Sequence, residues 1–358
     1  MNRRRGIGTA GIWLGGLAGM LAGCAVWAFA VRAERDEPRQ GAARDAATEA
    51  AAAPHADSAG SGVPSDKGET PGKARSESNP AQDTVSAKPA DAEYVDPSAV
   101  AKRFAAELTR LVKRGNLVTP AELHRQAQAA KRCPVVPVPD PGEKLGPAAI
   151  YARARPSVVV LGAIVQPKGH RRFHAALASG FVIAKEGVIA TNYHVIEAFQ
   201  HAKAVGVMTA DQRLFAVQAV VAADAHNDLA LVKIEADNLV PLPIASSVPL
   251  GAPVYCLSHP ALDTEETETA FFAFSEGVVS GKYRLRLDGP VPIDVLTVTA
   301  EYGKGSSGGP ILNEHGAVVG IICQTRALFH DEDETEPQMT WKLSRPSSSL
   351  LALLKPAD

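Results

Sequence analysis

The sequence predicts a mostly β fold, either a pair of barrels or a sandwich, with one helix at the end of the chain. Short β-rich runs follow one another from Ser157 onward, and turn residues separate them. About ten such runs over roughly two hundred residues are typical of an all-β domain. Only the stretch from Ser347 to Leu354 has a helical pattern. No segment repeats at a fixed period, which excludes a propeller or a solenoid.

Residues 1–31 have the features of a signal peptide or membrane anchor. Residues 3–5 are arginines, and the charge-free run 6–31 is long enough for a signal peptide and marginal for a membrane span. The sequence Leu-Ala-Gly-Cys ending at Cys24 resembles a lipobox, which predicts lipidation of Cys24. Ala-Phe-Ala ending at Ala30 is instead typical of ordinary signal cleavage. We expect export to the periplasm or cell envelope, as a lipoprotein, a released protein or a membrane-anchored one.

Residues 32–93 are predicted to be a disordered, low-complexity linker. Between Ala33 and Ala92 the only apolar residues larger than alanine are Val63 and Val85, and no aromatic residue occurs. Such a segment cannot bury a core. It suits a flexible spacer that holds a folded domain off a membrane, and equally a loose tail.

Residues 94–146 are predicted to form a helical pair and a proline-rich connector. Four apolar residues recur at helical spacing, namely Val100, Phe104, Leu108 and Leu111. Thr119 then supplies an N-cap, followed by a proline and by Glu122 as a capping-box residue, for a second helix to about Lys131. Prolines between 134 and 147 separate these helices from the β-rich region, which we assign to one domain, residues 147–358.

Composition excludes several other classes of protein. The net charge is −2 and no long basic run follows the N-terminus, which argues against nucleic-acid binding. The four cysteines form no CxxC pair, so neither a zinc ribbon nor a dense disulfide framework is expected. His170 and His174 have the spacing of metal ligands, but no carboxylate pattern accompanies them. We expect no metal and no cofactor.

Three local patterns stand in the order His, Asp, Ser. His194 directly follows a β-run, and Asp228 opens an otherwise apolar strand, where a carboxylate needs a partner. The third pattern is the glycine-rich turn 303–310, in which the backbone can approach a ligand closely and present a hydroxyl. Each pattern alone has an ordinary structural explanation, as a strand-end histidine, a turn cap and a tight turn. Their joint occurrence is what indicates chemistry.

These three residue types belong together because a serine hydroxyl is a poor nucleophile until a histidine removes its proton. The histidine in turn needs an acceptor that fixes its tautomer and stabilises its charge. In the glycine-rich turn, the N–H groups of Gly305 and Ser307 are expected to converge on the oxyanion of a tetrahedral intermediate. Such donors contribute about 3 to 4 kcal/mol each.

On these motifs the sequence resembles the trypsin-like serine peptidases of chymotrypsin fold, and within them the HtrA (Deg) group. The likeness runs from about Ala152 to Leu354 and rests on ARPSVVVL, SGFVIAKEGVIATNYHV, NDLALVKI, SEGVVSG and GKGSSGGPILNEHGAVVGI. The resemblance implies two six-stranded antiparallel β-barrels, chymotrypsin-like, with His194, Asp228 and Ser307 in the cleft between them. It makes Ser307 the nucleophile, because the family's serine directly precedes the Gly-Gly pair.

The sequence departs from the family pattern at two points. Ser306 stands where the family usually has asparagine or aspartate. This position donates no atom to the bond-breaking step, so the departure is expected to affect only the conformation of the loop. The chain also ends at Asp358 without room for a PDZ domain. We therefore expect a peptidase without PDZ domains, whose activation does not follow from that of PDZ-containing trimers.

The substrate pocket is harder to predict. Counting back from Ser307 as in the trypsin group places Glu301 near the pocket floor, where a carboxylate would favour a basic side chain. The alternative is an ordinary loop residue. Cys323, Gln324 and Thr325 are expected to form the strand that pairs with the substrate backbone.

The sequence thus predicts an exported serine endopeptidase acting through an acyl-enzyme on unfolded or exposed polypeptides. Its expected partners are polypeptide substrates, and no nucleic acid is expected. Attachment to a membrane through the N-terminus and formation of a homo-oligomer are left open. The alternative is a catalytically weak or inactive barrel protein that binds peptides or acts as a scaffold.

Overall fold

The structure is a computed structural model that describes residues 94–130, 132–166, 174–263, 268–287, 289–330 and 337–354. The expected export signal, lipidation at Cys24, the linker and His170 lie outside these residues. Within the described part of the chain, no helix has the length and apolar character needed to cross a bilayer.

The first barrel closes from six antiparallel strands in the order β1-β2-β3-β6-β5-β4. Its strands are β1 (Val158–Val165), β2 (His174–Ala184), β3 (Val188–Thr191), β4 (Ala204–Met208), β5 (Leu214–Asp224) and β6 (Leu229–Ile234). A short helix, α4 (Tyr193–Ala198), follows β3. Every residue of β3 is buried, so this strand ends at a fixed position shortly before His194.

The second barrel closes in the order β10-β11-β12-β9-β8-β7, again antiparallel. Its strands are β7 (Pro253–Ser258), β8 (Ala273–Leu285), β9 (Ile293–Val298), β10 (Pro310–Leu312), β11 (Val318–Phe329) and β12 (Pro337–Pro346). The chain then forms the helix α5 (Ser347–Leu353). The prediction of two six-stranded barrels with a C-terminal helix is confirmed.

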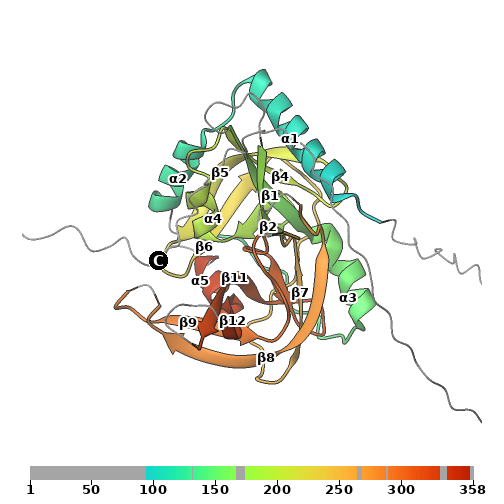
Figure 1. Cartoon of the computed structure of the whole chain (residues 1–358), viewed down its shortest axis with the longest axis vertical. Coiled ribbons are helices and arrows are strands. Elements are labelled where there is room, and N and C mark those ends of the chain that lie inside the picture. Colours follow the sequence, from blue (N-terminus) through green and yellow to red (C-terminus); the bar gives the residue numbers. More distant parts are fainter. Residues whose placement is uncertain are drawn as a thin grey trace, which may run out of the picture. The chain divides into compact units, whose positions relative to one another are not determined.

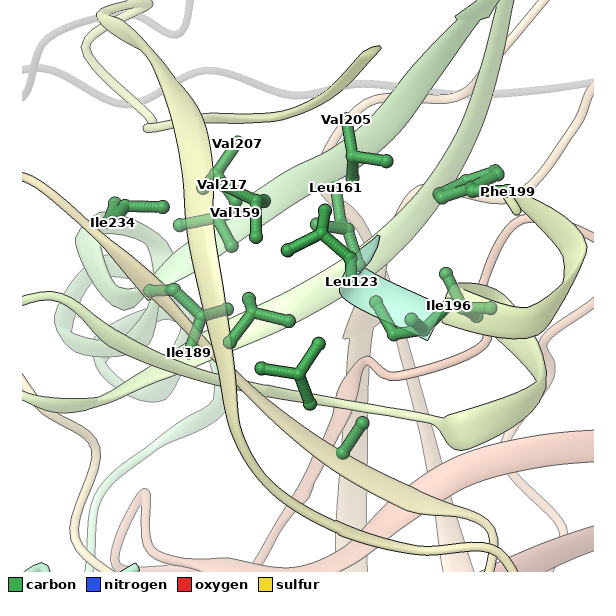
Figure 2. Packing of buried hydrophobic residues seen from close by; sticks show 14 of the residues in the cluster. Leu123, Val159, Leu161, Ile189, Ile196, Phe199, Val205, Val207, Val217 and Ile234 are labelled. Carbon is green, nitrogen blue, oxygen red and sulfur yellow. The ribbon is translucent and has the colours of Figure 1, made fainter. Parts of the chain in front are cut away.

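Alternating side chains of the first barrel fill its interior (Figure 2). Val159 and Leu161 from β1, Ile189 from β3 and Val207 from β4 are all fully buried there. Closing the sheet on itself removes free strand edges and gives these residues a common core.

Two helices before the barrels pack on the first barrel (Figure 1). On α1 (Pro97–Arg114), Phe104 and Leu108 are fully buried against residues of β1 and β4. On α2 (Pro120–Ala129), Leu123 enters the barrel core itself. The Thr119 hydroxyl caps α2 as predicted, by accepting a hydrogen bond from the Glu122 N–H at 3.2 Å.

A third helix, α3 (Pro147–Ala154), is absent from the sequence-based prediction. Its Ile150 is fully buried in a cluster that also takes residues from both barrels and from α5, among them Phe181, Leu257 and Leu350. This shared cluster joins the two barrels, so loops from both are held in a fixed relation.

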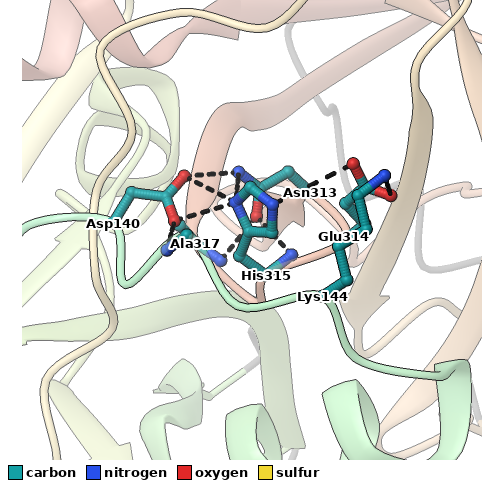
Figure 3. Close-up of polar contacts among 7 residues, drawn as sticks. Asp140, Lys144, Asn313, Glu314, His315 and Ala317 are labelled. Atoms are coloured by element: carbon teal, nitrogen blue, oxygen red, sulfur yellow. Dashed lines mark hydrogen bonds and ion pairs between the residues drawn. The ribbon is translucent and has the colours of Figure 1, made fainter.

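The proline-rich connector is held on the second barrel by polar contacts (Figure 3). The Asp140 carboxylate lies 2.9 Å from His315 Nδ1 and accepts a hydrogen bond of 2.7 Å from Asn313 Nδ2. The Leu145 N–H donates to the Glu314 carbonyl at 2.8 Å. The turn between β10 and β11 therefore anchors residues 140–145.

Candidate active site

His194 and Asp228 are paired in the first barrel. His194 lies on α4 directly after β3, and Asp228 lies directly before β6, which is the neighbour of β3 in the barrel. His194 Nδ1 is 2.8 Å from Asp228 Oδ2, and the backbone N–H of His194 donates to Oδ1 at 2.9 Å. Because a carboxylate is only an acceptor, the ring donates through Nδ1 and leaves Nε2 as a base.

The environment of Asp228 keeps its carboxylate charged. Burial raises the pKa of Asp228, but the positive charge and hydrogen bonds of His194 and a hydrogen bond from Cys323 lower it, and the net shift is downward. Asp228 also has a positive φ of 51°. Asn192, fully buried, donates from Nδ2 to the Asp228 carbonyl at 2.9 Å and so holds this backbone conformation.

Ser307 lies in the glycine-rich turn of the second barrel. Its hydroxyl donates to the Cys323 carbonyl at 3.1 Å. Two glycines shape the turn: Gly305 has φ +84° and Gly308 has φ +86°. A Cβ on Gly305 would lie 2.5 Å from the His259 carbonyl, and one on Gly308 would lie 2.2 Å from the Ser179 carbonyl. No residue with a side chain fits either position without moving the backbone.

A β-bulge at Cys323 brings the two halves of the site together. Ile322 pairs with Ser344 and Gln324 pairs with Leu343, so Cys323 is the extra residue of β11. A bulge frees one residue from the ladder and redirects its side chain. The Cys323 thiol lies 2.8 Å from Asp228 Oδ2, while its carbonyl accepts from Ser307.

The backbone of the turn has donors free for a ligand. The Lys304 carbonyl accepts from the Ala261 N–H at 2.7 Å, which fixes the peptide plane and directs the Gly305 N–H the opposite way. Among the described residues, neither the Gly305 N–H nor the Ser307 N–H has a hydrogen-bond acceptor.

Ser179 on β2 connects the first barrel to this turn. Its N–H donates to the Ser307 carbonyl at 2.9 Å, and its hydroxyl donates to the Gly305 carbonyl at 2.9 Å. The same hydroxyl accepts from the His259 N–H at 2.9 Å. Ser179 is fully buried, so it fixes the positions of Gly305 and Ser307 without exchanging partners with water.

Comparisons with known proteins agree with this geometry. Residues 178–321 match the family model described as trypsin-like peptidase domain. A probable periplasmic serine endoprotease DegP-like of Halomonas elongata is 33% identical over 160 residues, which are 44% of this chain and 31% of that protein. Protease Do-like 1, chloroplastic, of Arabidopsis thaliana is 37% identical over 150 residues, 40% of this chain and 32% of that protein.

The chain therefore carries a trypsin-like peptidase domain, which is similar to those of HtrA/Deg-type proteins. It spans about a third of the length of these two curated relatives. The crystal structure of Deg5 aligns with a TM-score of 0.43 and 25% identity, over 57% of this chain and 90% of that one.

Within the peptidase domain, the two neighbouring serines differ in burial. The Ser306 side chain is fully buried and its hydroxyl accepts from Ser258 Oγ at 3.0 Å. Ser307 is partly exposed beside the Cys323 bulge. Serine in place of the family's asparagine or aspartate at 306 is thus accommodated inside the turn.

Of the predicted specificity residues, Cys323 is buried and the others are exposed. The Glu301 side chain is 79% exposed, and its carboxylate pairs with Lys342 Nζ at 2.7 Å. The carboxylate that was predicted to lie near a pocket floor is therefore neutralised by a lysine that is mostly buried. Gln324 and Thr325 are exposed on β11 and pair with β12 on one side.

Three contributors to the geometry were missed from the sequence, namely Ser179, Asn192 and Arg345. Arg345 on β12 donates from Nε to the Asn227 carbonyl at 3.0 Å, and so ties the second barrel to the turn that carries Asp228. Ser179 and Asn192 lie in the motifs that carry the family resemblance, but a motif does not reveal which hydrogen bond each side chain makes. Arg345 carries no signal in the sequence.

Proposed function

We propose that the chain is an exported serine endopeptidase that hydrolyses peptide bonds of unfolded or exposed proteins through Ser307, His194 and Asp228. The observation that carries this proposal is the Cys323 bulge, whose thiol contacts Asp228 and whose carbonyl contacts Ser307. One residue thereby brings the pair from the first barrel next to the hydroxyl from the second.

In the proposed reaction, the Ser307 hydroxyl leaves the Cys323 carbonyl by rotating about χ1 and passes its proton to His194 Nε2. The oxygen then attacks the substrate carbonyl carbon, and the carbonyl electrons move to the oxygen. Asp228 stabilises the resulting imidazolium through Nδ1–H. The N–H groups of Gly305 and Ser307 are proposed to bind the oxyanion, since they have no other acceptor among the described residues.

The tetrahedral intermediate then collapses as the C–N bond breaks. His194 gives its proton to the leaving amine, and an acyl group remains on Ser307. Water attacks this ester with His194 again as the base, and the proton finally returns to Ser307 Oγ. A low pKa of Asp228 supports this cycle, because the carboxylate is charged at neutral pH whenever the imidazole takes up a proton.

A fluorophosphonate probe followed by peptide mapping tests the proposal. We expect the label on Ser307 of the folded full chain, and Ser307→Ala should lose both the label and casein hydrolysis while keeping the same unfolding transition. Ser306→Ala is the matched control and should still be labelled. Absence of label under every condition would favour the peptide-binding scaffold, and a label on Ser306 would reassign the nucleophile.

Export is supported by residues 1–31 and by the periplasmic designation of the Halomonas elongata relative. N-terminal analysis of the membrane and soluble fractions distinguishes the three routes. If Cys24 is lipidated, the mature chain starts at Cys24, and the Cys24→Ser variant loses the lipid. Ordinary cleavage predicts a start at Val31, and an anchor predicts an intact N-terminal segment that needs detergent for extraction. An unprocessed chain confined to the cytosol would contradict export.

A further inference from the structure

Three side chains of different chemistry meet at one oxygen atom of the candidate site. Asp228 Oδ2 lies 2.8 Å from His194 Nδ1 and 2.8 Å from Cys323 Sγ. The ligand atoms of His194, Asp228 and Cys323 all lie within 4.8 Å of one another. Within the described residues, no other group of three histidine, cysteine or acidic side chains is this close.

Peptide hydrolysis does not require the thiol of Cys323 in this group of three side chains. Asp228 already orients His194, and a hydroxyl in place of the thiol would also donate a hydrogen bond to Oδ2. A thiolate differs from a hydroxyl in binding borderline-soft metal ions strongly. Imidazole, thiolate and carboxylate are the three ligand types that proteins use for Zn²⁺.

We propose that His194, Asp228 and Cys323 form a Zn²⁺ site that inhibits the peptidase. Binding of the metal is independent of the proposed function, whereas the inhibition rests on it. In this proposal the ion is a reversible inhibitor and is not a resident cofactor.

The proton balance of binding explains the inhibition. Zn²⁺ replaces the two protons that now bridge to Asp228 Oδ2. The Cys323 proton leaves to solvent, and the proton of His194 Nδ1 moves to Nε2 as Nδ1 binds the metal. His194 then stays neutral but presents an N–H toward Ser307, so it no longer accepts the proton of the nucleophile.

The geometry needs only small movements to accept the ion. Zinc bonds of about 2.0 to 2.3 Å in a tetrahedral arrangement place ligand atoms roughly 3.3 to 3.7 Å apart. The two pairs that are now 2.8 Å apart therefore have to separate by roughly 0.5 to 0.9 Å. Asp228 Oδ1 keeps its hydrogen bond from the His194 N–H, which holds the carboxylate in place. The fourth position remains for a water molecule.

Charge and access also favour the site. The dication balances one carboxylate and one thiolate, so the buried group of ligands becomes neutral overall. The His194 side chain is 37% exposed, the Asp228 side chain is 15% exposed, and Cys323 is buried. The ion therefore enters from the side of the His194 ring.

Titration of the full chain with Co²⁺ tests binding without any need for activity. In the Ser307→Ala background, which prevents self-cleavage, we expect one equivalent of Co²⁺ to give a thiolate-to-cobalt charge-transfer band that Zn²⁺ displaces. Cys323→Ser keeps a donor to Asp228 but should abolish the band and raise the Kd for Zn²⁺ by roughly 10²-fold or more, since loss of groups that merely orient a ligand already costs 10- to 100-fold. Cys133→Ser is the matched thiol control and should keep the band.

A missing band with Cys323 intact, or a band that persists in Cys323→Ser, would overturn the proposal. Unfolding curves of each variant show whether a lost band reflects a lost ligand or a lost fold, and His194→Ala, which changes the most exposed ligand, gives a second test of the same band. If hydrolysis is present but Co²⁺ does not bind, the metal site fails and the peptidase stands. If Co²⁺ binds but the metal-free wild-type chain cuts no substrate, the metal site stands and the peptidase fails.

Discussion

Two histidine–aspartate pairs in the described part of the chain have nearly the same geometry and very different surroundings. His194 Nδ1 lies 2.8 Å from Asp228 at the candidate active site, and His315 Nδ1 lies 2.9 Å from Asp140 at the connector. The imidazole and carboxylate alone therefore do not distinguish a catalytic pair from a structural one.

What differs is the set of groups around each pair. His315 Nε2 lies 3.9 Å from the Glu314 carboxylate, and Asn313 also holds Asp140 (Figure 3). The Gly142 N–H donates a further hydrogen bond to the Asp140 carboxylate. All of these groups stabilise the connector against the turn between β10 and β11. At the other pair, the Cys323 bulge brings in a hydroxyl that belongs to a different barrel. We infer that catalysis needs the histidine–aspartate pair together with an accessible nucleophile that can change its hydrogen-bond partner.

The largest expected effect comes from Asp228→Asn. We expect turnover to fall by about 10⁴-fold, the loss that follows the corresponding change in trypsin, because the amide favours the wrong histidine tautomer. Kinetics on a short peptide substrate measure this loss, and Asp140→Asn is the matched control, with turnover within twofold of wild type. A loss below tenfold in Asp228→Asn would mean that another carboxylate orients His194. Asp224 is the nearest in sequence, but its carboxylate is bonded to Asn227.

The second effect concerns Ser179, which has no counterpart at the connector pair. Ser179→Ala removes the hydrogen bond to the Gly305 carbonyl, and we expect kcat to fall by roughly 10- to 100-fold with KM little changed. This loss is smaller than that of a direct oxyanion donor, because Ser179 only positions the turn.

Two controls separate this positioning role from a general loss of stability. Ser179→Thr restores a hydroxyl and should recover most of kcat. Ser280→Ala removes a serine that bonds to Thr297 on the second barrel, away from the turn, and should leave kcat unchanged. A rise in KM with unchanged kcat in Ser179→Ala would contradict the assignment.

The parts of this molecule that follow a pattern were predictable. Strand-forming runs and turn residues predict a pair of barrels or a sandwich, and the family resemblance implies the barrels that the structure has. The Thr119 cap predicts where α2 begins. The order His, Asp, Ser and the glycines of the turn predict the candidate triad, because those residue types are needed together for one reaction.

The parts that depend on register were not predictable. Cys323 becomes a contact of both Asp228 and Ser307 only because β11 carries one extra residue against β12, and no local sequence pattern reveals that bulge. Glu301 was placed by counting along the chain, and the structure pairs it with a lysine distant in sequence. The Asp140 and His315 pair joins residues 175 positions apart, so neither residue stands out in the sequence.

A smaller effect is expected at the connector pair itself. Asp140→Asn should lower the free energy of unfolding by about 1 kcal/mol, because it weakens hydrogen bonds to a charged group that is only partly exposed to water. Denaturant unfolding measures the change. Asp211→Asn is a control on a pair that is mostly exposed, Arg213 and Asp211, and should cost less. An Asp140→Asn variant as stable as wild type would show that the connector is held by its other contacts.

The smallest expected effect is the pH dependence of the difference in unfolding free energy between wild type and Asp140→Asn. Burial raises the pKa of Asp140, but hydrogen bonds from Gly142, His315 and Asn313 and the charge of His315 lower it below its ordinary value of 3.8. The folded state therefore binds fewer protons than the unfolded state near that pH, and the stabilisation is present above about pH 4 and lost as the pH falls through the folded pKa.

The comparison has to be made between variants, because other groups also titrate. Burial lowers the pKa of His259 to about 3, so folding keeps its imidazole neutral and stability declines in every variant as the pH falls below about 6.5. This background cancels when Asp140→Asn is subtracted from wild type, provided that the two sites do not interact. We expect the difference in unfolding free energy to shrink below about pH 4. A difference that persists unchanged at pH 2 to 3 would mean that the charge of Asp140 is not what holds the connector.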